Sequence, residues 1–116
     1  MIVKEKLEIK NIVKKRIGIF GGAFDPIHNG HIIPIQEIIK AHCLDKVHFV
    51  PTNIPTTSKK IIASPSQRIS MMKVCLNNAS SIIDDREIIR GGISYTIDTI
   101  ESVSYTHLTL PTKRIV

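Results

Sequence analysis

Short apolar segments alternate with segments of helical periodicity along most of this chain, and that alternation limits the folds open to it. The apolar, strand-like segments are residues 16–20, residues 46–51 and a stretch within residues 81–89. The helical segments follow them and begin near His31, near Ser64 and at Ser94 or Thr96. Each strand and helix pair takes up about thirty residues, which is typical of parallel strands joined by right-handed crossovers. We therefore expect an α/β fold with a parallel sheet and flanking helices.

Local signals predict where the first two helices begin. From His31 to about His42, four isoleucines fall on one helical face. Pro34 lies late in the first turn, where we expect a local adjustment of the backbone. The second helix begins with a capping box over residues 64–67, with proline in the first helical position. Residues 1–15 lack a clear periodicity and are compatible with an edge strand, a short helix or a mobile arm.

The composition is that of an ordinary globular protein with a mild positive charge. The chain has 116 residues, enough for one domain or part of one, and 42% of them are hydrophobic. Tryptophan is absent and aromatic residues make up 4%, so we expect an aliphatic core. The net charge is +6, but six basic and two acidic residues fall within the first sixteen. The rest of the chain carries no basic stripe, which disfavours nucleic acid as a partner and suits a small anionic ligand.

The cysteines and the apolar segments bear on the cellular compartment. Cys43 and Cys75 are far apart and lie among apolar residues in helical patterns, without metal-ligand spacing. We expect buried, reduced thiols rather than a disulfide. No apolar run reaches membrane-spanning length, and the start of the chain lacks the apolar stretch of a secretory signal. A cytoplasmic protein with no membrane partner is therefore expected.

Residues 21–31 carry the strongest chemical signal. Two glycines end the first predicted strand, and glycines there let backbone amides approach an anion closely. His28 and His31 lie three residues apart at a predicted helix start, so both rings can face one bound group, and Gly30 leaves room for it. Free amides at such an end favour phosphate, and parallel sheets bind ligands where their strands end. Alternatively, the glycines only make the turn, and the histidines cap the helix and pack.

The same string resembles the signature of adenylyl- and cytidylyltransferases, whose core is His-x-Gly-His. Residues 17–31 resemble the nicotinate-mononucleotide adenylyltransferases in particular, although Ala23 stands where that family usually has threonine. The resemblance implies a Rossmann-like fold, an ATP site, and catalytic roles for His28 and His31. The residues that it implies for ATP binding are Gly21, Gly22, Ala23, Phe24, His28 and His31.

Two later segments resemble the same family. Residues 90–100 resemble its Ser-Tyr-Thr-x-Asp-Thr segment, which holds the pyridine ring and its carboxylate, although alone they also read as a helix N-cap with polar flanks. Residues 49–55 resemble the strand and loop beside the substrate. The substrate-binding residues implied are Asn53, Tyr95 and Thr96. The family's Pro-Pro-His-Lys is incomplete here, and Lys59 is best explained as a solvated loop lysine.

The resemblance divides the chain into three parts. We expect an N-terminal extension over residues 1–15, a partial nucleotidyltransferase domain over residues 16–102, and a tail unlike the family over residues 103–116. No function is assigned to His107 or to the Lys113-Arg114 pair in that tail. The sheet would then be incomplete, corresponding to the N-terminal half of the family's domain, and the isolated chain inactive or nearly so.

The reaction that the resemblance implies is adenylyl transfer from ATP to nicotinate mononucleotide, giving deamido-NAD and pyrophosphate in NAD biosynthesis. Mg²⁺ is expected together with ATP, without a cluster of protein ligands. Three alternatives stay open: another adenylyl- or cytidylyltransferase of the same fold, an inactive nucleotide-binding fragment, and a basic nucleic-acid binder.

Overall fold

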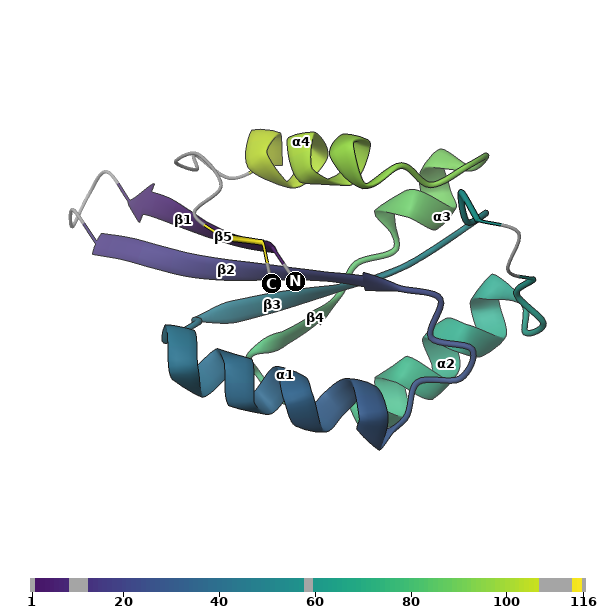
Figure 1. Ribbon diagram of the computed structural model, residues 1–116, viewed down its shortest axis with the longest axis horizontal. Helices are drawn as coiled ribbons and strands as arrows, with labels where there is room; N and C mark the ends of the chain where they lie inside the picture. Colours follow the sequence, from purple (N-terminus) through teal and green to yellow (C-terminus); the bar gives the residue numbers. More distant parts are fainter. Residues whose placement is uncertain (1, 9–12, 58–59, 107–113, 116) are drawn as a thin grey trace.

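In the computed structural model, which describes residues 2–8, 13–57, 60–106 and 114–115, one sheet carries helices on both faces (Figure 1). The predicted α/β fold with flanking helices is confirmed. Helices α1 and α2 cover one face, and α3 and α4 cover the other. The elements follow in the order β1 (Ile2–Glu8), β2 (Val13–Gly22), α1 (Asn29–His42), β3 (Lys46–Pro51), α2 (Pro65–Cys75), β4 (Ser81–Ile83), α3 (Arg86–Arg90), α4 (Thr96–Thr106) and β5 (Arg114–Ile115).

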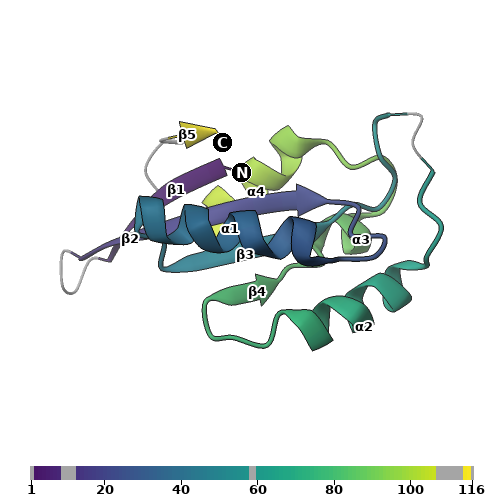
Figure 2. The ribbon, with the colours of Figure 1, turned by 60° about the horizontal axis from the view of Figure 1, so that its bottom comes forward.

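Among the described residues the sheet has five strands, in the order β4-β3-β2-β1-β5 (Figure 2). Its predicted parallel part is confirmed for three of them, since β2 pairs in parallel with β3, and β3 with β4. Strand β1 pairs antiparallel with β2, and β5 pairs antiparallel with β1. The sheet is therefore mixed rather than wholly parallel, and the stretch before β2 contributes an inner strand rather than an edge strand.

The third strand lies within the predicted stretch of residues 81–89 and is short. Within the predicted stretch, β4 takes up only Ser81–Ile83. The carboxylate of Asp84 then accepts hydrogen bonds from the backbone and side chain of Arg86, and the chain turns into α3. This five-residue helix was not predicted. The next helix, α4, begins at Thr96, one of the two predicted starts.

The first two helices begin at or near their predicted positions. Helix α1 begins at Asn29, slightly before the predicted start, so Pro34 stands inside the helix. Because proline has no N–H to donate to the carbonyl four residues back, the helical ladder lacks one bond there. Helix α2 begins as predicted, with Ser64 as N-cap, proline in the first turn, and Gln67 completing the capping box.

Two apolar cores form, one on each face of the sheet. The core under α1 and α2 is the larger, and the core under α4 is built on Ile19, Val50 and Val103. The expectation of a purely aliphatic interior is wrong for the first core, where all three phenylalanines meet with ring centroids 5.4 to 6.2 Å apart. The three are Phe20, Phe24 and Phe49. Their cluster lies at the carboxyl ends of β2 and β3 and supports the turn that follows β2.

The cysteines are free, as predicted, but both are exposed rather than buried. Cys43 is the C-cap of α1 and adopts a left-handed conformation with φ of 51°. Cys75 is the last residue of α2. Each thiol therefore lies at a helix end, outside the apolar face that its helix packs against the sheet.

Candidate active site

The carboxyl end of β2 runs into a tight turn that Phe24 anchors. Phe24 has a left-handed backbone with φ of 48°, and its side chain is only 1% exposed. Its ring packs edge-on against Phe20 and His31. A buried ring with these contacts holds the uncommon backbone conformation in place, so the turn after Gly22 has a fixed shape.

His28 and His31 stack at the N-terminus of α1, with ring centroids 4.0 Å apart. His28 is the N-cap, and its Nδ1 accepts the N–H of Gly30 at 3.0 Å. Nδ1 of His31 accepts the N–H of His28 at 3.2 Å and completes a capping box. An Nδ1 that accepts a hydrogen bond carries no proton, so the proton of each neutral ring is on Nε2. Each imidazole therefore has its donor at Nε2.

Gly30 makes room for the ring of His28 rather than for a ligand. A Cβ at this position would lie 2.7 Å from Cε1 and 2.9 Å from Nδ1 of His28. The space expected for a bound group beside this glycine is thus filled by the capping ring. The His-x-Gly-His spacing follows from that geometry, because the ring of the cap residue lies over the second helical position.

A cavity of about 370 Å³ opens at the carboxyl end of β2, toward α3 and α4. Its size falls within the range of about 300–1,000 Å³ that is common for small-molecule sites. The residues that line it include Gly21, Gly22, Thr52, Glu87, Thr96 and Thr99. The histidine pair is not among the lining residues. The pair lies at the start of α1, on the other face of the sheet. The turn over residues 21–24, called the glycine turn below, lies between the histidine pair and the cavity.

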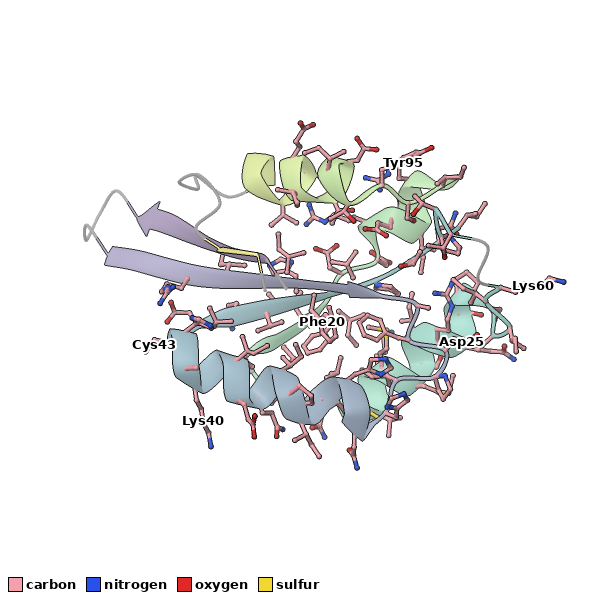
Figure 3. The ribbon with its side chains drawn as sticks, in the orientation of Figure 1. Phe20, Asp25, Lys40, Cys43, Lys60 and Tyr95 are labelled. Carbon is pink, nitrogen blue, oxygen red and sulfur yellow. The ribbon has the colours of Figure 1, made fainter. Side chains whose placement is uncertain are left out.

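The structure brings part of the predicted substrate set to this cavity. Thr96 lines it together with Ser94. Tyr95 is 49% exposed and lies on the α4 side of the molecule (Figure 3). Asn53 donates from Nδ2 to the carbonyl of Gly92 at 2.8 Å, and its backbone N–H donates to Oγ of Ser94 at 2.9 Å. Asn53 therefore joins the loop after β3 to the segment that enters α4. Lys59 lies outside the described residues.

A buried carboxylate in the cavity wall was not predicted. Glu87 is only 6% exposed, and its Oε2 accepts a hydrogen bond from Oγ1 of Thr99. Nη2 of Arg90 lies 3.5 Å from the same hydroxyl. The hydrogen bond between Glu87 and Thr99 joins α3 to the start of α4. A sequence pattern could not single it out, because polar residues in these two segments are equally consistent with a solvated surface.

A buried cluster of His48, Asp84 and Arg86 joins β3 and the end of β4 to helices α3 and α4. Nδ1 of His48 lies 2.8 Å from Oδ2 of Asp84, and Nε of Arg86 donates to both carboxylate oxygens at 2.8 Å. Nη1 of Arg86 also donates to Oγ of Ser102 in α4 at 2.9 Å. Burial raises the pKa of Asp84, but hydrogen bonds from His48 and Arg86 outweigh it and hold that pKa well below its ordinary value. Asp84 is therefore an ionised link between the sheet and α4.

Neither a metal cluster nor a membrane span is found in the part of the chain that the structure describes. No three His, Cys, Asp or Glu side chains of these residues are grouped closely enough to hold an ion. Every helix among them is too short or too polar to cross a lipid bilayer.

Comparison with known proteins matches most of the chain to one family. The profile of the family described as cytidylyltransferase-like matches residues 19–108. A probable nicotinate-nucleotide adenylyltransferase of Borreliella afzelii is 47% identical over 92 residues, covering 76% of this chain and 47% of that protein. A probable nicotinate-nucleotide adenylyltransferase of Shouchella clausii is 42% identical over 95 residues, covering 80% of this chain and 50% of that protein. The chain thus spans about half the length of the curated relatives it matches.

A solved structure has the same fold. It is that of Plasmodium falciparum nicotinic acid mononucleotide adenylyltransferase complexed with NaAD, with a TM-score of 0.63. The match covers 79% of this chain and 46% of the solved chain, at 20% sequence identity. At that identity the likeness establishes the α/β architecture, and the chemistry has to be argued from the side chains.

Proposed function

The chain belongs to the cytidylyltransferase-like family, and we propose that it supplies the ATP site and the catalytic histidines of a nicotinate-nucleotide adenylyltransferase. The proposed reaction transfers the adenylyl group of ATP to nicotinate mononucleotide and gives deamido-NAD and pyrophosphate, a step of NAD biosynthesis. The names of the relatives support this choice of substrate. We further propose a cytoplasmic protein without nucleic-acid or membrane partners.

The observation that carries the proposal is the stacked histidine pair beside the glycine turn. Both Nδ1 atoms are used in the capping box, so both rings are held in place by the backbone of α1 itself. Their Nε2–H donors then belong to two rings only 4.0 Å apart. Two fixed donors at a helix N-terminus suit the oxygens of one phosphoryl group, where negative charge grows during transfer.

The chemistry proposed for these residues is an in-line displacement. A phosphate oxygen of nicotinate mononucleotide attacks the α-phosphorus of ATP, the bond from that phosphorus to the bridging β-phosphate oxygen breaks, and pyrophosphate leaves. Because the nucleophile is already an anion, no covalent enzyme intermediate is needed, and catalysis depends on positioning and charge stabilisation. His28 and His31 donate to phosphate oxygens as charge builds. The backbone amides proposed to hold ATP are those of Gly21, Gly22, Ala23 and Phe24.

The cavity beside α4 is the proposed place of the pyridine nucleotide. Its wall offers the hydroxyls of Ser94 and Thr96, which can hydrogen-bond a carboxylate. Tyr95 follows Ser94 and is half-exposed, so it can cover the ring from the rim. Asn53 acts on the loop geometry through Gly92 and Ser94. With ATP at the histidines and the pyridine nucleotide in the cavity, the two reacting phosphates would meet at the glycine turn.

Mg²⁺ is proposed to accompany ATP rather than to reside in the protein. The described residues contain no group of three potential metal ligands, and this donor set fits an ion coordinated mainly by phosphate oxygens and water. Bound in that way, Mg²⁺ neutralises part of the phosphate charge. The turn and the histidines would still have to orient the phosphate oxygens.

The proposal is tested by incubating the purified protein with ATP, MgCl₂ and one of four acceptors at a time. The acceptors are nicotinate mononucleotide, nicotinamide mononucleotide, phosphopantetheine and FMN, and products are identified by mass spectrometry. We expect deamido-NAD as the only product, formed at a low rate because the chain spans about half the length of its relatives. A product from phosphopantetheine or FMN alone would indicate another transferase of this fold. ATP binding without any product would indicate a nucleotide-binding fragment, and strongly salt-dependent DNA binding would indicate a nucleic-acid binder.

A further inference from the structure

Arg68 of α2 is a buried arginine that joins three separate segments. Its side chain is only 1% exposed. Nη1 donates to the carbonyl of Ala23 at 3.0 Å and to that of Thr52 at 2.6 Å, and Nε donates to the carbonyl of Ala63 at 3.2 Å. These carbonyls belong to the turn after β2, the loop after β3 and the segment that enters α2. One guanidinium thus connects all three.

Asp25 strengthens this junction from the side of the turn. Its carboxylate accepts the backbone N–H groups of Ile62 at 2.6 Å and Ala63 at 2.9 Å. In Figure 3, Asp25 lies in the turn after β2, beside the start of α2. Burial lowers the pKa of Arg68, and the charge of Asp25 opposes that shift. An arginine stays protonated at ordinary pH, so the junction contains a buried charge held by carbonyls and a nearby carboxylate.

The segments that Arg68 joins also border both proposed binding sites, because the turn that contains Ala23 is the proposed ATP site and the loop after β3 borders the cavity proposed for the pyridine nucleotide. Thr52 lines the cavity, and its N–H donates to the carbonyl of Gly22 at 2.9 Å. Ala23 directly follows Gly22, which lines the same cavity. The glycine turn and the loop after β3 are therefore held together twice, once by a direct backbone bond and once through Arg68.

We propose that Arg68 is a positioning residue for the ATP site: it fixes the glycine turn against the loop after β3 without contacting the substrate. This assignment rests on the proposed function for its effect on ATP, but the fixing of the turn can be measured without ATP. A guanidinium suits the role because its planar fork directs several donors at once. A lysine at this position would keep the charge but present a single ammonium group.

The test compares Arg68→Lys and Arg68→Met with Arg16→Met as a matched control. Arg16 also donates from Nη1 to a backbone carbonyl, that of His42, but near the amino-terminal part of β2 and far from the turn. Three measurements are made on each protein: urea unfolding, amide hydrogen exchange of Thr52, Ile62 and Ala63, and the Kd for ATP by titration calorimetry.

We expect faster exchange and weaker ATP binding in both Arg68 variants. Losing charged hydrogen bonds to the turn should speed exchange of the three amides by roughly tenfold or more and raise the Kd for ATP by about tenfold to a hundredfold. Arg68→Lys keeps the charge and tests the geometry even if Arg68→Met fails to fold. Arg16→Met should lower the stability while leaving the three amides and the ATP Kd close to wild type.

The possible outcomes separate this assignment from the proposed function. Wild-type protein that does not bind ATP contradicts the proposed function, whereas faster exchange confined to the three amides would still support Arg68 as the residue that fixes the turn. Wild-type exchange at these amides in Arg68→Lys overturns the assignment. So does a uniform acceleration of all amides, which reports global unfolding. Faster local exchange with an unchanged ATP Kd also overturns it, since Arg68 would then hold the loops without influencing the site.

Discussion

The N-terminal ends of α1 and α2 are closed by similar hydrogen-bonding patterns, built from different side chains. In α2, Oγ of Ser64 accepts the N–H of Gln67 at 3.2 Å, and Oε1 of Gln67 accepts the N–H of Ser64 at 3.0 Å. In α1, Nδ1 of His28 accepts the N–H of Gly30, which is one position earlier in the helix, and Nδ1 of His31 accepts the N–H of His28. Both ends thereby satisfy backbone amides that would otherwise lack partners at the start of a helix.

The difference shows what the histidines add beyond capping. Serine and glutamine cap α2 with neutral groups, so a stable helix end does not require imidazole. An imidazole adds a second nitrogen, Nε2, which carries an N–H donor while Nδ1 serves the cap. With the rings stacked at 4.0 Å, two such groups are concentrated at one helix end. Phosphate transfer is the kind of chemistry that uses them.

The second helical position shows the same contrast. In α1 that position is Gly30, where a Cβ would lie 2.7 Å from the ring of His28. In α2 it is Ser66, whose Oγ lies 3.2 Å from Oγ of Ser64. A small capping side chain tolerates a neighbour at this position, and a stacked imidazole does not. The glycine is therefore a consequence of using histidine as the cap.

The largest effect on the rate of adenylyl transfer is expected from the double variant His28→Ser with His31→Gln, which gives α1 the capping side chains of α2. The cap is preserved, so we expect the free energy of unfolding to change by less than about 1 kcal/mol. The low rate of deamido-NAD formation expected of this chain should fall below detection, since each lost donor typically costs about 100-fold to 1,000-fold. Initial rates and urea unfolding check this, with His42→Gln at the other end of α1 as the control. An unchanged rate would mean that the histidines only cap the helix.

Substituting Gly30 should have an intermediate effect that depends on the cap residue. Gly30→Ala forces the ring of His28 to move, and overpacking of this kind costs about 1–3 kcal/mol. In a His28→Ser background the clash is gone, and alanine should stabilise the helix by roughly 0.5–1 kcal/mol relative to glycine. A double-mutant cycle by urea unfolding measures the coupling between the two positions. Equal costs in both backgrounds would show that the His28 ring is not the reason for the glycine.

The two helix ends also show what the sequence could predict about the site. The capping box of α2 was predicted because Ser64 and Gln67 follow a known local pattern with partners three residues apart. The closeness of His28 and His31 was predicted for the same reason. Capping by these histidines was considered only as the alternative interpretation, since the usual capping side chains are those of Ser, Thr, Asp and Asn.

Contacts between distant segments were not predictable from local patterns. Arg68 reaches Thr52 and Ala23, which are 16 and 45 residues away in the sequence. Asn53 reaches Gly92 across 39 residues. Such contacts depend on how the loops pack at the end of the sheet, and periodicity reports only on the face that each helix or strand presents. The same limit explains why the pairing of β1 with β2 and the carboxylate of Glu87 in the cavity wall emerged only from the structure.

Removing the cap of α2 alone should have the smallest effect and tests whether capping and chemistry are separate. Ser64→Ala leaves the N–H of Gln67 without its side-chain acceptor, which typically costs about 1 kcal/mol of unfolding free energy. We expect the ATP Kd and the rate of adenylyl transfer to stay at wild-type values, because the imidazoles and Arg68 are untouched. Ser70→Ala, an exposed change in the same helix, is the control for urea unfolding. A rate loss comparable to that of the α1 double variant would show that helix capping itself governs the site, and the distinction drawn here between the two helix ends would fail.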